Sequence, residues 1–149
     1  MAAVIKIRRA GEHELSGVLR LWREADASPT PTDTIEELIC LKDAPGAVLL
    51  VAMDDRRVVG SVIGGWDGWR GNIYRLAVAP DRRRQGIGRK LVQEISRILF
   101  DKGASRLSAL VEHEHPWASG FWDSMFDSGY RRDPRYARYI MDRGDGPMR

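Results

Sequence analysis

The sequence is poor in cysteine and has no long apolar segment. Cys40 is the single cysteine among 149 residues, which excludes an intrachain disulfide and is typical of a reducing compartment. No run approaches the roughly 18 apolar residues that a membrane span needs, so we expect no membrane partner. The first ten residues, MAAVIKIRRA, lack the apolar core of a signal peptide, and we expect a cytoplasmic protein.

Metal-ligand patterns and a strong charge bias are also missing. The chain has three histidines, and neither HExxH nor CxxC occurs, so no metal site is expected. The 24 basic residues are offset by 21 acidic ones, which leaves a net charge of +3. This excess is too small to predict a nucleic-acid partner by itself, and it would suit a small polyanionic ligand equally well.

The apolar pattern predicts one α/β (α+β) domain over residues 1–143 and a flexible tail over 144–149. Cys40, in the helical pattern EELICLK, is expected to be a core residue, and Thr32 or Asp33 is expected to cap that helix. We predict strands at 4–9, 47–53, 58–65, 72–80 and 106–112, helices at 12–25, 33–42, 86–103 and 115–127, and one or two final strands within 129–143.

A basic turn with two glycines, RRRQGIGRK, precedes the predicted helix from Gly86. Glycines let the backbone turn sharply and approach a ligand closely. The first N–H groups of a helix lack internal partners, and the macrodipole favours an anion there. The turn therefore indicates a phosphate site, although an ordinary turn or a contact with nucleic acid would also explain it.

The residues around this turn resemble a known family. The segment YRLAVAPDRRRQGIGRKLV resembles motif A of the GNAT superfamily, xLxVxPxxRxxGxG/AxxLL, which binds acetyl-CoA. The later segment LSALVEHEHPWASGFWDSMFDSGY is similar to a degraded motif B. The chain looks most like a bacterial branch that includes ribosomal-protein N-terminal acetyltransferase-like proteins. The resemblance implies a GNAT fold, with a mixed, mostly antiparallel central sheet and helices on both faces.

The resemblance also implies where acetyl-CoA binds. A bulge in the predicted strand 72–80 would separate it from the next strand near Val111. Backbone groups of strand 72–80 would pair with the pantetheine arm. Amides of the glycine turn would hold the diphosphate. Arg82 and Lys90 would meet the 3′-phosphate or only solvent. The implied coenzyme-binding residues are Leu76, Ala77, Val78, Arg83, Arg84, Gln85, Gly86, Ile87, Gly88 and Arg89.

The catalytic residues are less well defined, because the chain departs from motif B. The family's usual tyrosine acid falls on Trp122, whose indole cannot act as an acid near neutral pH. The sequence SMF adds about one helical turn before Gly129. We name Glu112, His115 and Tyr130 as candidates for general base and acid, and each could instead be an ordinary surface or strand residue. His113 and Glu114 are further candidates for the base, and Tyr136 and Tyr139 for the acid.

Two further positions bear on the acceptor. Trp66 and Trp69 flank a turn and could line an acceptor pocket or a dimer contact. Asp67, between them, could contact an amine, although an Asp-Gly turn explains it equally well.

We therefore expect an acetyl-CoA-dependent N-acetyltransferase that acetylates a primary amine of a peptide N-terminus or a small molecule, as a possible homodimer. A catalytically silent acyl-CoA-binding module is the first alternative. Nucleic-acid binding through residues 82–90 is the second.

Overall fold

The computed structural model describes residues 4–144 as two compact units, which divide between Val111 and Glu112. The prediction of one domain over residues 1–143 stays a prediction. The predicted tail lies outside the described residues, apart from Gly144.

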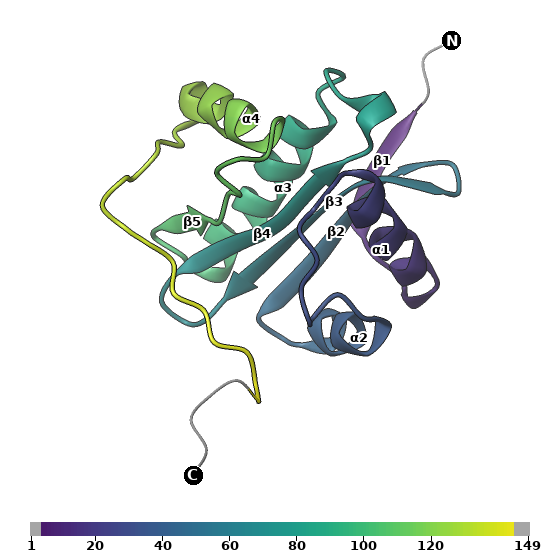
Figure 1. Ribbon diagram of the computed structural model, residues 1–149, viewed down its shortest axis with the longest axis horizontal. Coiled ribbons are helices and arrows are strands. Elements are labelled where there is room, and N and C mark those ends of the chain that lie inside the picture. Colours follow the sequence, from purple (N-terminus) through teal and green to yellow (C-terminus); the bar gives the residue numbers. More distant parts are fainter. Residues whose placement is uncertain (1–3, 145–149) are drawn as a thin grey trace. The chain divides into compact units, whose positions relative to one another are not determined.

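The first unit is built on a five-stranded sheet in the order β1-β2-β3-β4-β5 (Figure 1). The first three pairings are antiparallel, and β5 pairs with β4 in parallel, so the predicted mixed, mostly antiparallel sheet is confirmed. The strands are β1 (Ile5–Arg9), β2 (Ala47–Asp54), β3 (Arg57–Trp66), β4 (Gly71–Val78) and β5 (Leu107–Ala109).

The predicted hairpin around the polar DDRR is strands β2 and β3. Asp54 pairs with Arg57 at its end, and Asp55 takes a positive φ of 53° in the turn. Six consecutive residues of β2, 48–53, and seven of β3, 58–64, are buried. Continuous burial replaces the usual alternation because helices cover both faces of these strands.

Helix α3 (Ile87–Lys102) covers one face of the sheet. Its apolar side chains pack where β3 has glycine. A Cβ at Gly60 would lie 2.9 Å from Leu91 Cδ1, and one at Gly64 would lie 2.7 Å from Ile95 Cδ1. The absence of side chains at these two positions lets the helix approach the strand closely.

Helices α1 (Leu15–Glu24) and α2 (Ile35–Asp43) cover the opposite face (Figure 1). The buried Trp22 donates its Nε1 hydrogen to Ser61 Oγ at 2.9 Å. Ser61 follows Gly60, so its side chain points to the other face of the strand. A short 3₁₀ helix, Glu12–Glu14, precedes α1.

Helix α2 corrects two predictions. Its N-cap is Thr34, whose Oγ1 accepts the Glu37 N–H at 3.1 Å, and neither Thr32 nor Asp33 has this role. Cys40 is exposed, not part of the core. Leu38 faces the core, and two residues further along a helix the side chain is turned by about 200°, onto the opposite side.

The second unit has one helix, α4 (Ala118–Ser124), which continues into a 3₁₀ turn, Met125–Ser128. The extra turn predicted from SMF is therefore present. Pro116 precedes the N-cap, Trp117, so α4 begins three residues after residue 115, the predicted start. The predicted final strands are wrong for the described residues, since 129–144 contain no strand. A strand needs a ladder partner, and Pro134 within this segment lacks a donor.

Candidate active site

Strand β4 carries a bulge in its middle. Ser61 of β3 pairs with Ala77 and Ile63 pairs with Tyr74, so two residues of β4, Arg75 and Leu76, lie opposite one residue of β3. Arg75 adopts a φ of 53°, in the left-handed region. A bulge bends its strand and redirects the backbone groups that follow it. The bulge that the resemblance implied is confirmed.

The parallel pairing with β5 stops where this bulge begins. It covers Gly71, Asn72 and Ile73 and ends with the Leu110 N–H donating to the Ile73 carbonyl at 3.2 Å. Val111 belongs to no strand, which agrees with the expected separation.

The backbone groups after the bulge alternate between the two edges of β4. The Ala79 N–H donates to the Val59 carbonyl at 2.8 Å, so the groups of Ala77 also face β3. Those of Leu76 and Val78 face the opposite edge, beyond the end of the pairing with β5. This edge has the donor and acceptor spacing that an extended amide chain needs.

A tight turn follows β4 and leads into α3. Pro80–Arg82 form a 3₁₀ turn, Arg84 has a φ of 65°, and Gly86 has a φ of 82° as the N-cap of α3. A Cβ at Gly86 would have no neighbour within 4 Å. The backbone at the start of the helix is therefore open to a ligand.

The start of α3 lacks a side-chain cap. The first hydrogen bond within the helix runs from the Lys90 N–H to the Gly86 carbonyl at 3.1 Å, so the N–H groups of Ile87 and Gly88 have no carbonyl within the helix. The helix dipole adds partial positive charge at this end. The turn has the donors and the potential of an anion site.

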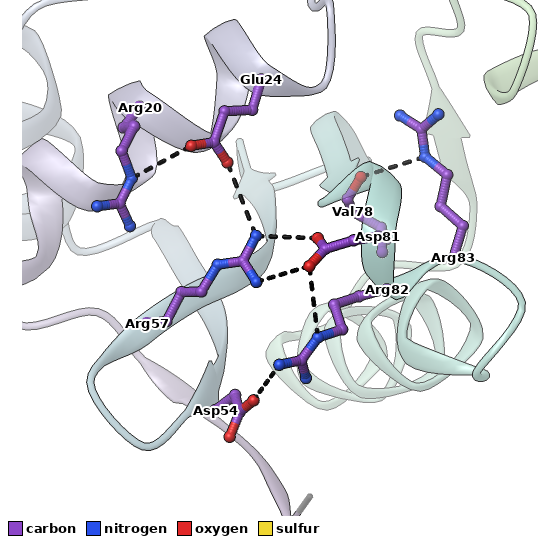
Figure 2. Close-up of polar contacts among 8 residues, drawn as sticks. All are labelled: Arg20, Glu24, Asp54, Arg57, Val78, Asp81, Arg82 and Arg83. Atoms are coloured by element: carbon purple, nitrogen blue, oxygen red, sulfur yellow. Dashed lines mark hydrogen bonds and ion pairs between the residues drawn. The ribbon is translucent and has the colours of Figure 1, made fainter.

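Arg83, at the leading basic position of the motif, connects the turn to β4 (Figure 2). Its Nε donates to the Val78 carbonyl at 3.2 Å, along the edge that faces away from β3. Burial lowers the pKa of Arg83, and the charge of Asp26 opposes that shift. A guanidinium remains protonated in proteins, so the cation stays at the junction of strand and turn.

An ion-pair network anchors the turn to the β2–β3 hairpin (Figure 2). Arg57 donates two hydrogen bonds of 2.9 Å to Asp81, and Arg82 bonds to Asp54. Arg57 also lies 4.0 Å from Glu24 of α1. The Arg57 guanidinium lowers the pKa of Asp81. Arg82 is therefore occupied by an ion pair within the fold, whereas Lys90 is exposed.

The structure thus brings the predicted coenzyme-binding residues together as one continuous feature. They form the end of a bulged strand, a fixed turn and the open start of a helix. Two observations go beyond the sequence reasoning, namely the partners of Arg82 and the attachment of Arg83 to Val78. Asp54, which bonds to Arg82, lies on another element, and the bond from Arg83 to Val78 depends on the backbone conformation of the turn. No local sequence pattern predicts either contact.

The turn between β3 and β4 explains Asp67. Its Oδ1 accepts the N–H groups of Trp69 and Arg70, both at 2.8 Å, and these bonds lower the pKa of Asp67. Trp69 is 70% exposed, and the Arg70 guanidinium lies over its ring at 4.1 Å. Asp67 therefore acts as a turn residue.

In the second unit, His115 caps α4. Its Nδ1 accepts the backbone N–H groups of Trp117 and Ala118, each at 3.2 Å. The backbone N–H of His115 donates to the Glu112 carbonyl at 3.2 Å. These cap bonds occupy Nδ1, so this nitrogen is not open to a substrate amine. Glu112 is exposed.

Tyr130 belongs to an aromatic cluster in the same unit. Its ring meets Trp122 edge to face at 5.2 Å, and Trp122 meets Phe121 in the same way at 5.7 Å. Trp117 stacks on Phe121 at 4.9 Å. Tyr130 is half-buried. Trp122 packs against its ring and therefore lies beside the candidate acid.

Residues 4–144 lack two further features. No helix there is long and apolar enough to span a membrane. No group of three or more His, Cys, Asp or Glu side chains in this part of the chain is placed to hold a metal ion.

Comparison with known proteins agrees with this geometry. An acetyltransferase of Pectobacterium atrosepticum is 27% identical over 121 residues, which cover 81% of this chain and 86% of that protein. The crystal structure of the PaiA N-acetyltransferase of Thermoplasma acidophilum in complex with coenzyme A has a TM-score of 0.75 at 18% identity, covering 87% of this chain and 91% of that one.

A second solved structure has the same fold. It is an aminoglycoside acetyltransferase from an uncultured soil metagenomic sample in complex with sisomicin, with a TM-score of 0.71 at 21% identity, covering 92% of this chain and 97% of that one. The statistical model of the acetyltransferase (GNAT) family matches residues 15–126, most of the chain. The chain therefore belongs to the acetyltransferase (GNAT) family and is an N-acetyltransferase.

Proposed function

We propose that the protein transfers an acetyl group from acetyl-CoA directly to a primary amine of a peptide N-terminus or a small molecule. The amine nitrogen attacks the thioester carbonyl carbon, a C–N bond forms and the C–S bond breaks. Coenzyme A leaves as the thiolate, which takes up a proton, and the nitrogen loses one. This step needs no covalent enzyme intermediate, so the exposed Cys40 has no role in it.

The observation that carries the proposal is the bulged β4 leading into the open start of α3. The outward backbone groups of Leu76 and Val78 suit the pantetheine amides, and Ala77 lies between them. The N–H groups of the turn suit the diphosphate. The Val78 carbonyl already accepts from Arg83, and its second lone pair can accept from the coenzyme. The assigned residues are Leu76, Ala77, Val78 and the turn Arg83, Arg84, Gln85, Gly86, Ile87, Gly88 and Arg89.

The ionisation of the acceptor favours amines of low pKa. Neutralising a lysine amine at pH 7 costs about 4.6 kcal/mol, whereas an α-amine costs about 1.4 kcal/mol. An enzyme without a strong base can deprotonate the second kind through water. Peptide N-termini and weakly basic small-molecule amines are therefore the proposed acceptor class. The aminoglycoside acetyltransferase among the structural neighbours supports the small-molecule branch.

We propose Tyr130 as the acid that protonates the departing thiolate and Glu112 as the base that removes the amine proton through water. Tyr130 has a phenol on the edge of the aromatic cluster, and Glu112 is exposed to solvent. His115 is the weaker candidate because its Nδ1 accepts the two cap bonds of α4. Tyr130→Phe and Glu112→Gln should each lower kcat and change its pH profile with acetyl-CoA affinity preserved. Loss of affinity in either variant would contradict the assignment.

The test is acetyl-CoA binding by calorimetry, followed by thiol release against a panel of amines. The panel contains dipeptides with free α-amines, polyamines and amino sugars, and N-acetylated dipeptides are the matched controls. We expect binding and turnover with one class of free amine. Binding without turnover on the panel would favour the silent module, and no binding would refute the proposal.

The proposal includes a cytoplasmic location, where the lone Cys40 remains a free thiol. It also includes a homodimer, because the described part of the second unit exposes five large apolar residues, Phe126, Tyr136, Tyr139, Ile140 and Met141. Sedimentation should give twice the mass of the chain, and the mass of one chain would contradict the dimer.

A further inference from the structure

Arg75 is a strained residue at a sensitive place. It is the first residue of the β4 bulge, and its φ of 53° lies in a region that a side chain such as arginine rarely adopts. The next residue, Leu76, begins the segment assigned to the coenzyme arm. The conformation at Arg75 therefore decides where the backbone groups of Leu76 point. A strained conformation persists only when its surroundings hold it.

The side chain of Arg75 supplies such a restraint. Its Nη2 lies 2.8 Å from both carboxylate oxygens of Asp33 and donates to the Ser28 carbonyl at 2.9 Å. A longer contact of 3.3 Å reaches Thr30 Oγ1. The side chains of Arg75 and Asp33 are 18% and 20% exposed, so the pair is shielded from solvent more than a surface ion pair.

Asp33 is itself held in place by its own loop. It accepts the Thr30 N–H at 3.1 Å and the Thr30 hydroxyl at 2.9 Å. The carboxylate therefore belongs to a fixed turn between α1 and α2, and it is a firm anchor for a distant cation.

The backbone of Arg75 is restrained from the same side. Its guanidinium lies over the Trp22 ring at 4.9 Å, and Trp22 donates to Ser61 Oγ at 2.9 Å. Ser61 Oγ lies 3.5 Å from the Arg75 carbonyl. Helix α1 and the loop after it thus contact the side chain of the bulge residue, and Ser61 of β3, which is bonded to Trp22 of α1, contacts its carbonyl.

We propose that Arg75 is a positioning residue, whose ion pair with Asp33 holds the bulge of β4 in the conformation that aligns Leu76 with the acetyl-CoA arm. This inference rests on the proposed function. Arg75 does not touch the reacting atoms in this account. It acts through the backbone, by stabilising a conformation that its own Cβ disfavours.

This role makes an unusual prediction about glycine. Glycine adopts a positive φ without steric cost, so Arg75→Gly removes the restraint and the need for it together. Arg75→Met removes the ion pair but keeps the Cβ, and Asp33→Ala removes the anchor. Arg75→Lys keeps the ion pair, because all four contacts involve one nitrogen and an ammonium has three donors.

The experiment measures the acetyl-CoA Kd and KM of these variants, with thermal melting to confirm folding. We expect the Kd of Arg75→Lys and Arg75→Gly to stay within about threefold of the wild-type Kd. Arg75→Met and Asp33→Ala should bind acetyl-CoA about tenfold more weakly, a loss within the range that the strain of one residue produces. Arg97→Met, which removes exposed ion pairs on α3, is the control and should leave Kd unchanged.

The order of the variants decides the outcome. Weakening by Arg75→Gly equal to that by Arg75→Met would overturn the proposal, since the side chain itself would then matter. Wild-type affinity in Arg75→Met or in Asp33→Ala would overturn it too. A purely structural role would lower the melting temperature of all variants without this order in Kd.

Hydrogen exchange separates the inference from the proposed function, because it needs no coenzyme. In Asp33→Ala and Arg75→Met, amides of 74–78 and of 27–34 should exchange faster. In Arg75→Gly, the increase in exchange rate should be larger for the amides of 27–34 than for those of 74–78. Unchanged exchange in 74–78 of Asp33→Ala would refute the restraint even if acetyl-CoA binds. Failure of the wild type to bind acetyl-CoA would instead refute the proposed function.

Discussion

Gly86→Asp tests the anion site with a charge placed at the start of α3. Gly86 has a φ of 82° and is exposed, and a Cβ there would meet no atom within 4 Å. The added side chain therefore meets no neighbouring atom. A left-handed residue usually costs about 1–2 kcal/mol of backbone strain. For Asp the cost is at the lower end, about 1 kcal/mol, because Asp and Asn adopt this region more readily than other side chains.

The charge has a larger effect on binding than on folding. Two like charges 4 Å apart repel by about 1 kcal/mol in water and about 4 kcal/mol near a protein surface. For an exposed turn we take about 2 kcal/mol, which is about a thirtyfold increase in the acetyl-CoA Kd. The helix dipole favours the new carboxylate by about 0.3–1 kcal/mol, so the variant should fold.

Gly86→Asn is the matched control, since it has the same shape and backbone preference but no charge. Gly68→Asp places the same charge at another glycine with a positive φ, 94°, and open space. Calorimetry should show thirtyfold weaker acetyl-CoA binding for Gly86→Asp alone, while S-acetylpantetheine, which lacks the diphosphate, binds all variants alike. Equal weakening by Asp and Asn would refute the electrostatic reasoning. No weakening by Asp would place the diphosphate elsewhere.

Three other predictions concern stability and turnover. Arg8 donates a hydrogen bond of 2.6 Å to Glu14 and lowers the pKa of Glu14 below its ordinary 4.5. At a pH near or below 4.5 the unfolded chain therefore binds more protons than the folded chain, and the stabilisation present at neutral pH is lost on acidification. The free energy of urea unfolding of Glu14→Gln should change less between neutral and acidic pH than that of the wild type. An equal change would contradict this. Leu91 is 0% exposed, so Leu91→Ala should lose about 2–5 kcal/mol of unfolding free energy, and a loss under about 1 kcal/mol would mean that the site is loosely packed. Trp122→Phe should leave turnover within a few-fold because the indole packs, whereas collapsed turnover with preserved acetyl-CoA binding would give Trp122 a chemical role.

The turn before α3, where we propose that the diphosphate binds, could be predicted from the sequence because its signals are local. Gly86 and Gly103 mark the two ends of α3, and Pro80 follows the end of β4, as expected. The candidate catalytic residues were harder. The cap that His115 provides depends on the start of α4, which lies two residues after Pro116 and not at it.

The core and the final segment show where local pattern fails. Cys40 sits in an apolar pattern, but a shift of two residues from Leu38 turns it to solvent. The Tyr- and Ile-containing stretch after Gly129 has strand-forming residues, yet the described part contains no strand. Intrinsic preference forms a strand only with a partner for its hydrogen bonds.

The sequence by itself determined the order of the elements as far as α4 and the glycine turn before α3, because each depends on residues close together in the chain. Tertiary structure alone decided the partners of the charged residues. Arg75 reaches Asp33, 42 positions earlier, and Arg57 reaches Asp81, 24 positions later. Such pairs form only after the sheet and helices bring distant segments together, because ion pairs are too weak to direct folding and too long-range in sequence to be read from it.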